Sequence, residues 1–349
     1  MAQKLYEESN IQAIANAIRG KNGLTTTYKV SEMAAAITAI EGGGSTPIEP
    51  PVGDGKTRIY IHLEDGRLSP VLAICPNGTV TVDWGDGTES NTLTGTSLTT
   101  LQYTPAHNYA AAGDYVISLT VDGSAALYSE DVTTNYLCLL KYGSTGDNRD
   151  MIYRESIHKV EIGNGISISK YAFNNFKALK SITIPNTVSS IGDSAFYNCG
   201  CLSSISLPNT ITSIGNNVFE RCHCLSNISL PNTITSIGKY MFSECFILQK
   251  CNIPDTVTSI NDYAFYSCYS LPSITIPHGV TRIGRYAFGV CYGIKYLDFT
   301  ALTAVPTLVS SNAFYNMPTD CEIRVPAALA NEWKNATNWA TFANKIVGV

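Results

Sequence analysis

The chain has 349 residues, of which 15% are charged, and its formal net charge at pH 7 is -5. This length exceeds most single hydrophobic cores and predicts more than one domain. Sparse charge without a run of Lys or Arg argues against a surface built to neutralise phosphates, so we expect no nucleic-acid partner.

The sequence predicts neither export by a standard signal nor a membrane span. The first residues, MAQKLYEESNIQAIANAIRGKNG, lack a basic stretch followed by an apolar one. No run of about 18 apolar residues occurs, so we expect no membrane insertion. The eleven cysteines are an odd number, which favours reduced thiols made in a cytosol over a disulfide framework.

Residues 1–41 are predicted to form a helical hairpin. Ile11, Ile14 and Ile18 follow helical spacing, and Ser31 can cap a second short helix. Helices this short cannot form a core alone, so we expect the module to pack on copies of itself or on another protein. Residues 42–55, GGGSTPIEPPVGDG, have the composition of a linker.

Residues 56–140 are predicted to form a small antiparallel β-sandwich. The segments TRIYIHL, GTVTVDW and DYVISLTV alternate in the manner of half-buried strands. VDWGDGTES at 82–90 and HNYAAAGDYVISLTV at 107–121 resemble the PKD-type immunoglobulin-like module, although its usual W-D-F-G-D-G turn is shortened here. This resemblance implies a spacer or a binding unit.

The same turn offers two interpretations. Asp83, Asp86 and Glu89 lie close together in sequence, and oxygen-rich loops can hold calcium. Asp-Gly is first of all a turn dipeptide, however, and the spacing is not that of an EF-hand. A tight hairpin is the favoured interpretation, and calcium remains open.

Residues 141–325 are predicted to form a solenoid, because residues 168–299 repeat every 23 residues. ISLPNTITSIG occurs at 205–215 and again at 228–238. A fixed period of this size is typical of a solenoid, in which each coil buries its apolar face on its neighbours. The columns that keep the period are Phe173, Phe196, Phe219, Phe242, Phe265 and Phe288, and Pro185, Pro208, Pro231, Pro254 and Pro277.

The repeating unit I-G-x-x-A-F-x-x-C-x-x-L-x-x-I-x-L/I-P-N-T resembles the BspA-like class of leucine-rich repeat. We expect L-x-x-I-x-L to form a strand and the proline after it, which has no N–H to donate, to end that strand. The next apolar pair, Val188 and Ile191, is expected to fill a second layer with the phenylalanines. The fold class is therefore multidomain and mainly β.

After the last repeat, residues 326–349, PAALANEWKNATNWATFANKIVGV, change to a helical pattern. Trp333, Trp339, Phe342 and Ile346 supply its apolar positions. We expect a helical C-terminal cap that closes the last layer of the solenoid.

Cysteine also forms a column, three residues after five of the six phenylalanines: Cys199, Cys222, Cys245, Cys268 and Cys291. Cysteines of neighbouring coils could form stacked disulfides or bind a row of metal ions. A buried free cysteine, however, more often packs as a small hydrophobic residue. Cys201 and Cys224 with His223 between them lack the C-x2-C spacing of zinc sites. We favour the packing interpretation and predict no metal and no cofactor.

Two columns become aromatic in the later coils. Two residues before the phenylalanines stand Tyr171, Ser194, Asn217, Tyr240, Tyr263 and Tyr286, and after the column cysteines stand Gly200, His223, Phe246, Tyr269 and Tyr292. Patches of such rings are typical of recognition sites, although the rings could also merely cover coil edges or face apart. The candidate ligand-binding residues are Tyr240, Tyr263, Tyr286, Phe246, Tyr269, Tyr292, Tyr266 and Tyr296.

The order of these modules predicts function. NIQAIANAIRGKNG and VSEMAAAITAI resemble the N-terminal module of tail and tail-fibre proteins from phages that infect Gram-positive gut bacteria. The resemblance implies a virion protein, made in the host cytoplasm, whose residues 1–45 contact other tail or baseplate proteins or form a homo-oligomer. Its solenoid is then expected to bind a host-surface glycan or protein without catalysis, since no motif of a known active site occurs. The alternative is a bacterial surface adhesin or an interaction scaffold.

Overall fold

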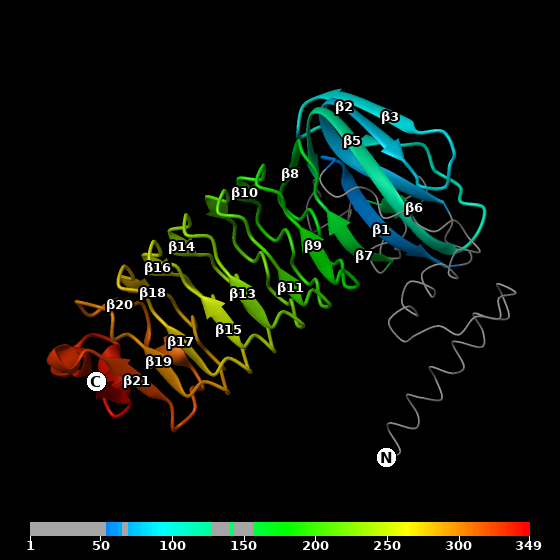
Figure 1. Ribbon diagram of the computed structural model, residues 1–349. Helices are drawn as coiled ribbons and strands as arrows, with labels where there is room; N and C mark the ends of the chain where they lie inside the picture. The colour runs from blue at the N-terminus through cyan, green and yellow to red at the C-terminus, as the bar shows by residue number, and fades with distance from the viewer. Residues whose placement is uncertain (1–53, 65–68, 128–139, 143–155) are drawn as a thin grey trace, which may run out of the picture. The chain divides into compact units, whose positions relative to one another are not determined.

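The computed structural model describes residues 54–64, 69–127, 140–142 and 156–349, which are mainly β with little helix (Figure 1). These residues belong to one compact unit that runs from Gly53 to Val349. The helical hairpin predicted for residues 1–41 and most of the linker lie outside the described residues.

The six N-terminal strands pair in antiparallel fashion, and the two longest of them take part in most of the pairs. They are β1 (Thr57–Leu63), β2 (Pro70–Asp83), β3 (Asn91–Thr96), β4 (Gln102–Tyr103), β5 (Gly113–Leu127) and β6 (Leu140–Tyr142). β5 pairs with β1 and β2, and β2 also pairs with β3, β4 and β6. The three strand segments predicted from alternation are confirmed, but β2 and β5 are longer than their patterns. Gly78 lies opposite Gly123 with φ of 121° and 100°, and a Cβ at Gly78 would lie 2.2 Å from the carbonyl oxygen of Asp122.

The residues that carried the PKD resemblance gather around Trp84. The indole of Trp84 is buried, stacks on His107 at 4.6 Å between ring centroids, and donates a 2.7 Å hydrogen bond to Asn91 Oδ1. The hydroxyl of Tyr109 donates a 2.8 Å hydrogen bond to the carbonyl oxygen of Trp84. β2 and β3 form a hairpin as predicted, but residues 84–90 connect them in a loop instead of a tight turn.

Each repeat contributes two parallel strands to the solenoid (Figure 1). The first strands are β7 (Ile157–Glu161), β9 (Ser181–Thr183), β11 (Ser204–Ile205), β13 (Asn227–Ser229), β15 (Lys250–Asn252), β17 (Ser273–Thr275), β19 (Tyr296–Asp298) and β21 (Glu322–Val325). The second strands are β8 (Ile166–Ile168), β10 (Ser190–Ile191), β12 (Ser213–Ile214), β14 (Ser236–Ile237), β16 (Ser259–Ile260), β18 (Arg282–Ile283) and β20 (Thr307–Leu308). The first strands confirm the L-x-x-I-x-L prediction. The second strands were expected only as apolar core positions.

The array continues the hydrogen bonding of the N-terminal strands. β5 pairs with β8 in parallel, and β1 pairs with β7 antiparallel. Arg58 is buried at this junction, where its guanidinium forms ion pairs with Asp54 and Glu161. A buried cation is tolerated only when carboxylates or other acceptors compensate it. The first coils therefore extend the sheet of β1 and β5.

A third side of each coil consists of turns, and we call it the turn face: residues 171–178 and their equivalents at 23-residue steps. The amide nitrogens of Tyr171, Phe173 and Asn175 donate to carbonyl oxygens of the next coil at 2.9, 2.7 and 2.8 Å. Tyr171 and Asn175 have φ of 61° and 63°, and their equivalents in later coils share this left-handed backbone. The turn face is thus held by a regular hydrogen-bond ladder as the strands are.

Stacked phenylalanines fill the core behind the turn face. Neighbouring rings from Phe173 to Phe288 stack with centroids 5.3–5.7 Å apart. The column cysteines lie beside them, fully buried as free thiols, and each thiol donates to the carbonyl oxygen of the phenylalanine in the preceding coil at 3.1–3.3 Å. The burial of this column agrees with the packing interpretation, and none of its thiols forms a disulfide.

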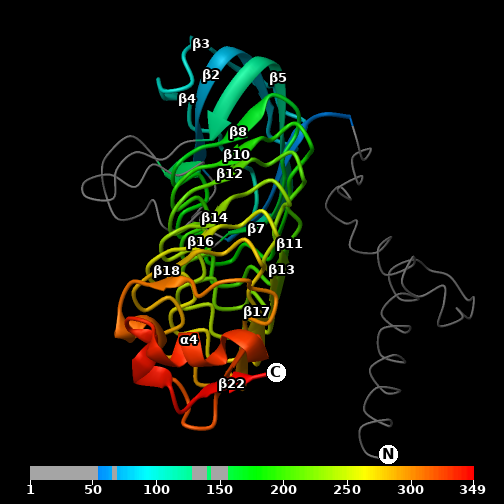
Figure 2. The same cartoon turned by 90° about the vertical axis from the view of Figure 1, so that its left-hand side faces the viewer.

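The C-terminal segment closes the solenoid but is less helical than predicted (Figure 2). It contains the 3-10 turns η2 (Ser311–Phe314), η3 (Ala327–Leu329) and η4 (Trp339–Phe342), the helix α4 (Ala330–Asn335), and the strand β22 (Ile346–Gly348). α4 ends because Ala336 is extended and Asn338 has a φ of 66°. β22 pairs with β21, and Trp333 and Trp339 are buried against Phe299 at 5.1 and 5.5 Å.

Candidate binding surface

A first stack of aromatic rings runs along the turn face of the later coils. Tyr240 stacks on Tyr263 at 4.6 Å with an interplanar angle of 6°, and Tyr263 stacks on Tyr286 at 4.9 Å and 15°. Tyr315 meets Tyr286 edge-on at 5.6 Å and continues the row. We call Tyr240, Tyr263, Tyr286 and Tyr315 the tyrosine ladder.

A second stack begins on the same turns, four residues after the phenylalanines. His223 stacks on Phe246 at 4.7 Å, Phe246 stacks on Tyr269 at 4.9 Å, and Tyr269 stacks on Tyr292 at 5.5 Å. These four residues are the mixed ladder. Their spacing follows the stacking distance of the coils, as expected when equivalent side chains share a rotamer.

Tyr266 lies between the two ladders. Its ring meets Tyr263 edge-on at 5.4 Å and Tyr286 at 6.3 Å. The pKa of Tyr266 is raised, first by burial and then by the nearby phenols of Tyr263, Tyr269 and Tyr315. Seven of the eight candidate residues therefore lie on the turn face of the later coils.

Large apolar side chains remain accessible on this surface. The exposed fractions are 43% for Ile247, 40% for Tyr269, 57% for Tyr292 and 47% for Tyr315. Exposed rings grouped in a patch are typical of recognition surfaces, whereas single exposed hydrophobic residues need no explanation. Ile247 and Tyr315 were missed from the sequence, although Tyr315 follows Phe314 as Tyr266 follows Phe265.

Tyr296 does not join this surface. It lies on β19, where it aligns with Ser273 of β17, and the guanidinium of Arg324 lies 3.9 Å from its ring centroid. It lies on the strand face, by which we mean the surface formed by the first strand of each coil, β7 to β21. Counting 23 residues back from Tyr296 reaches Ser273 and then Lys250, so the repeat itself contains this information.

The tyrosine ladder occupies a strained backbone position. Tyr240, Tyr263 and Tyr286 have φ of 55°, 59° and 53°, in the left-handed region. That conformation costs a non-glycine residue about 1–2 kcal/mol, and Asn adopts it more readily than most. The chain uses Asn217 and Ser194 at equivalent positions, so tyrosine is not required by the fold. Each stacked pair of rings contributes about 0.5–1.5 kcal/mol, which roughly offsets the cost of the left-handed backbone.

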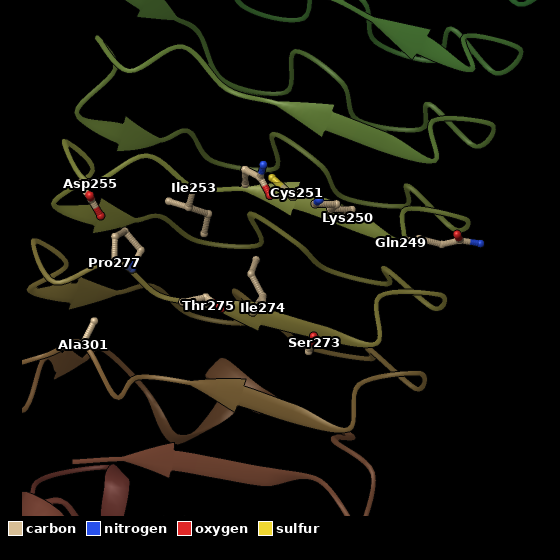
Figure 3. Close-up of a pocket in the computed structure, with 11 residues that line it drawn as sticks. Gln249, Lys250, Cys251, Ile253, Asp255, Ser273, Ile274, Thr275, Pro277 and Ala301 are labelled. Carbon is tan, nitrogen blue, oxygen red and sulfur yellow. The ribbon is translucent and has the colours of Figure 1, made fainter. Parts of the chain in front are cut away.

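The strand face offers a different kind of surface (Figure 3). A depression of about 510 Å³ is lined by β15 and β17, including Lys250, Asn252, Thr275 and Asp255. A neighbouring depression of about 530 Å³ reaches Ser206, directly after β11, and Ser229 of β13. These linings mix polar and aliphatic side chains, and they contain no aromatic ring. The strand face can form hydrogen bonds but lacks the ring area found on the turn face.

The Asp83–Asp86 turn uses its carboxylates internally. Asp83 Oδ1 accepts a 3.0 Å hydrogen bond from the amide of Gly85, and Asp86 accepts hydrogen bonds from Thr88 and, at 2.8 Å, from His107. Burial alone would raise the pKa of Asp86, but the hydrogen bonds from Thr88 and His107 hold it below its usual value. Among the residues that the structure describes, no three His, Cys, Asp or Glu side chains form a group that could hold a metal ion.

The comparison with known families concerns the repeats. Residues 148–271 and 189–319 match the family described as BspA type leucine-rich repeat region, in six copies. This part of the chain is a BspA-type leucine-rich-repeat region. The match confirms the resemblance drawn from the repeating unit. It does not extend over residues 56–140, whose likeness to PKD modules stays a prediction.

Solved structures that resemble the chain are also repeat proteins. A leucine-rich cell surface protein from Faecalibacterium prausnitzii is 23% identical, with a TM-score of 0.40 over 60% of this chain and 68% of that one. The Leucine Rich Repeat protein of T. pallidum is 23% identical, with a TM-score of 0.41 over 55% of this chain and 92% of that one. A leucine-rich repeat protein from Bacteroides ovatus is 22% identical, with a TM-score of 0.32 over 49% and 60%. No curated protein matches the chain significantly.

Helices in the described part of the chain are short. None is both long enough and apolar enough to cross a lipid bilayer.

Proposed function

We propose that the chain is a non-catalytic binding protein that recognises a cell-surface glycan or protein through the turn face of its BspA-type repeats. The observation that carries this proposal is the pair of aromatic ladders on the later coils. Tyr240, Tyr263 and Tyr286 of the tyrosine ladder stand at strained positions where other coils have Asn or Ser, and sites where a chain keeps strain are candidates for function.

The larger area of aromatic rings on the turn face favours it over the strand face as the binding surface. Aromatic side chains dominate the energy of most recognition surfaces, and a central ring often contributes about 2 kcal/mol or more. Two rows of rings, with Tyr266 packed edge-on against the tyrosine ladder, provide such a centre, with Tyr292 and Tyr315 exposed at its end. A ligand laid along the solenoid axis would contact several coils at once, and several copies of the chain on one particle or cell would add avidity.

Two kinds of protein are proposed to have this binding activity: a surface adhesin or interaction scaffold, and a phage tail protein. The repeat match supports a surface adhesin or interaction scaffold more directly than a phage tail protein, because it covers the repeats alone. The phage-tail hypothesis depends on residues 1–45, which lie outside the described residues. Antibody against the chain separates the two: it labels purified particles released by lysis if the chain is a tail protein, and the wall fraction of intact producer cells if it is an adhesin.

The binding role is tested with labelled full-length chain on intact Gram-positive cells, purified cell walls and mucin-coated surfaces. Tyr263→Asn removes the central ring while installing the residue that Asn217 already provides at this backbone position. We expect its affinity to fall by about 30-fold for a lost central ring. Ser229→Tyr, which adds a ring to the strand face, is the matched control and is expected to bind as the wild type does. Equal loss in both variants, or no loss in Tyr263→Asn, would contradict the proposal.

A further inference from the structure

The tyrosine ladder is interrupted on the early coils, and a hollow lies at the interruption. Tyr171 occupies the ladder position in the first coil, Ser194 and Asn217 occupy it in the next two, and Tyr240 resumes the row. At about 4.8 Å a coil, Tyr171 and Tyr240 are about 15 Å apart. The small side chains between them leave a hollow of about 560 Å³, within the range of about 300–1,000 Å³ typical of small-molecule sites.

The lining of this hollow combines amides with ring faces. Tyr171, Tyr197, Asn174, Asn175 and Asn198 line its first half. Asn198 Nδ2 donates a 2.6 Å hydrogen bond to Asn175 Oδ1, and Asn175 in turn donates to Asn174. Each amide group has two donor hydrogens and an oxygen with two lone pairs, and this relay uses one hydrogen of Asn198 and one of Asn175. The remaining groups suit a ligand that both donates and accepts hydrogen bonds.

The charges of the hollow disfavour an anion. Glu220 lines its second half and accepts a hydrogen bond from Asn217. Arg221, whose guanidinium lies 5.7 Å from the ring centroid of Tyr197, is paired with Glu244, with 3.3 Å between Nε and Oε2. The arginine is thus balanced by Glu244, and the carboxyl group of Glu220 stays as an acceptor. Hydroxyl groups can donate to it, whereas a phosphate or carboxylate would be repelled.

Tyr240 is not among the residues that line the hollow, but it stands in the next coil after Asn217. One face of its ring stacks on Tyr263 of the following coil, so the other face is directed toward the coil of Asn217. The pKa of Tyr240 is raised by burial and by the carboxyl group of Glu220, which lines the hollow. A flat saccharide ring has C–H groups for such a face and hydroxyl groups for the amides and the carboxyl group.

We infer that this hollow is a saccharide subsite that takes a neutral, hydroxyl-rich sugar unit of a longer glycan, which then continues along the tyrosine ladder. The inference rests on the proposed function and names its ligand class. A protein ligand would need a broader apolar contact than amides and one carboxyl group provide.

The test uses the full-length chain with neutral tetrasaccharides of glucose, galactose, mannose and N-acetylglucosamine, and with tetragalacturonate as the acidic probe. Binding is measured by saturation-transfer NMR and calorimetry. We expect at least one neutral probe to bind and tetragalacturonate to bind more weakly. Binding of none of the neutral probes, or preference for the acidic one, would overturn the inference.

Ser194→Tyr fills the hollow with the ring that the ladder already carries in the first and fourth coils, at a backbone φ of 53° that Tyr286 also adopts. We expect its affinity for the neutral probe to fall about tenfold or more, with an unchanged circular dichroism spectrum. Glu220→Gln, which keeps the shape and removes one acceptor, is the second variant and is expected to bind about three- to tenfold more weakly. Ser229→Tyr on the strand face is the control. Wild-type affinity in Ser194→Tyr and Glu220→Gln would refute the subsite.

The two proposals fail in different ways. If Tyr263→Asn abolishes binding to cells while Ser194→Tyr binds every saccharide and every cell as the wild type does, the subsite is wrong and the aromatic surface stands. If Ser194→Tyr loses saccharide binding but Tyr263→Asn still binds cells, the subsite stands and the role of the ladder in surface binding is wrong. Cell binding that survives periodate but not protease treatment would indicate a protein ligand and contradict the subsite.

Discussion

Replacing one phenylalanine of the column by alanine should weaken the coupling between neighbouring coils of the solenoid. Phe242 is fully buried and stacks on Phe219 at 5.7 Å and on Phe265 at 5.3 Å. Replacement of a buried Phe by Ala typically costs about 3–5 kcal/mol, and the two lost ring pairs are included in or slightly add to this range. A whole domain is stable by about 5–15 kcal/mol, so Phe242→Ala removes a large share of the stability that holds neighbouring coils together.

The assay combines urea unfolding with thiol labelling. The thiol of Cys268 donates to the carbonyl oxygen of Phe242 at 3.2 Å, so it reports on the opening of that coil. In Phe242→Ala we expect a lower unfolding midpoint, a reduced m-value because the array no longer unfolds as one unit, and faster labelling of Cys268. Phe246→Ala, a partly exposed ring in the same turn, is the matched control and should lower stability by less than about 2 kcal/mol.

A small effect would refute this reasoning. If Phe242→Ala changes the free energy of unfolding by no more than Phe246→Ala does, the phenylalanine column does not hold the coils together. Unchanged labelling of Cys268 would lead to the same conclusion.

Three further predictions concern thiols and pH. Cys201 and Cys224 are exposed, whereas burial raises the pKa values of the column thiols; brief alkylation of the native chain followed by mass spectrometry should therefore modify these two before any column cysteine. Burial raises the pKa of Glu220, so the folded chain favours the protonated carboxyl group and loses stability as pH rises through that pKa. Glu220→Gln should then be more stable than the wild type near neutral pH, by about 1 kcal/mol, and equally stable once pH is low enough to protonate the glutamate. The pKa of Asp86 is lowered, so its stabilisation is present at neutral pH and is lost as pH falls below about 4; Asp86→Asn should be less stable by about 1–3 kcal/mol at pH 7 in thermal unfolding, with the difference closing in acid.

The repeat made much of the solenoid predictable. Its period placed Phe242 in a stacked core and Cys245 as a buried thiol, because identical side chains in stacked coils meet the same surroundings. The two-residue strands such as Ser259–Ile260 were missed, since two residues are too few to show alternation. The cap was overestimated as helical because Trp339, Phe342 and Ile346 follow helical spacing, whereas Asn338 takes a left-handed backbone that divides the segment.

The candidate surface was predictable in composition but not in geometry. Column counting grouped Tyr263 with Tyr286, and the structure brings them into contact. Nothing about tyrosine indicates a left-handed backbone, so the strain at Tyr263 could not be read from the sequence. The parallel pairing of β5 with β8 is a contact between distant segments and leaves no local pattern. The hollow at Ser194 likewise depends on what surrounds a small residue.

The most direct test of the central claim is a map of which side chains become protected when the full-length chain binds a surface. Hydroxyl-radical footprinting on cell walls or cells that bind the chain, read by mass spectrometry, reports each residue separately. The turn-face account predicts protection of Tyr269, Tyr292 and Tyr315, with Lys250 and Thr275 on the strand face unchanged. Protection of Lys250 and Thr275 while the three tyrosines stay as reactive as in the free chain would contradict it.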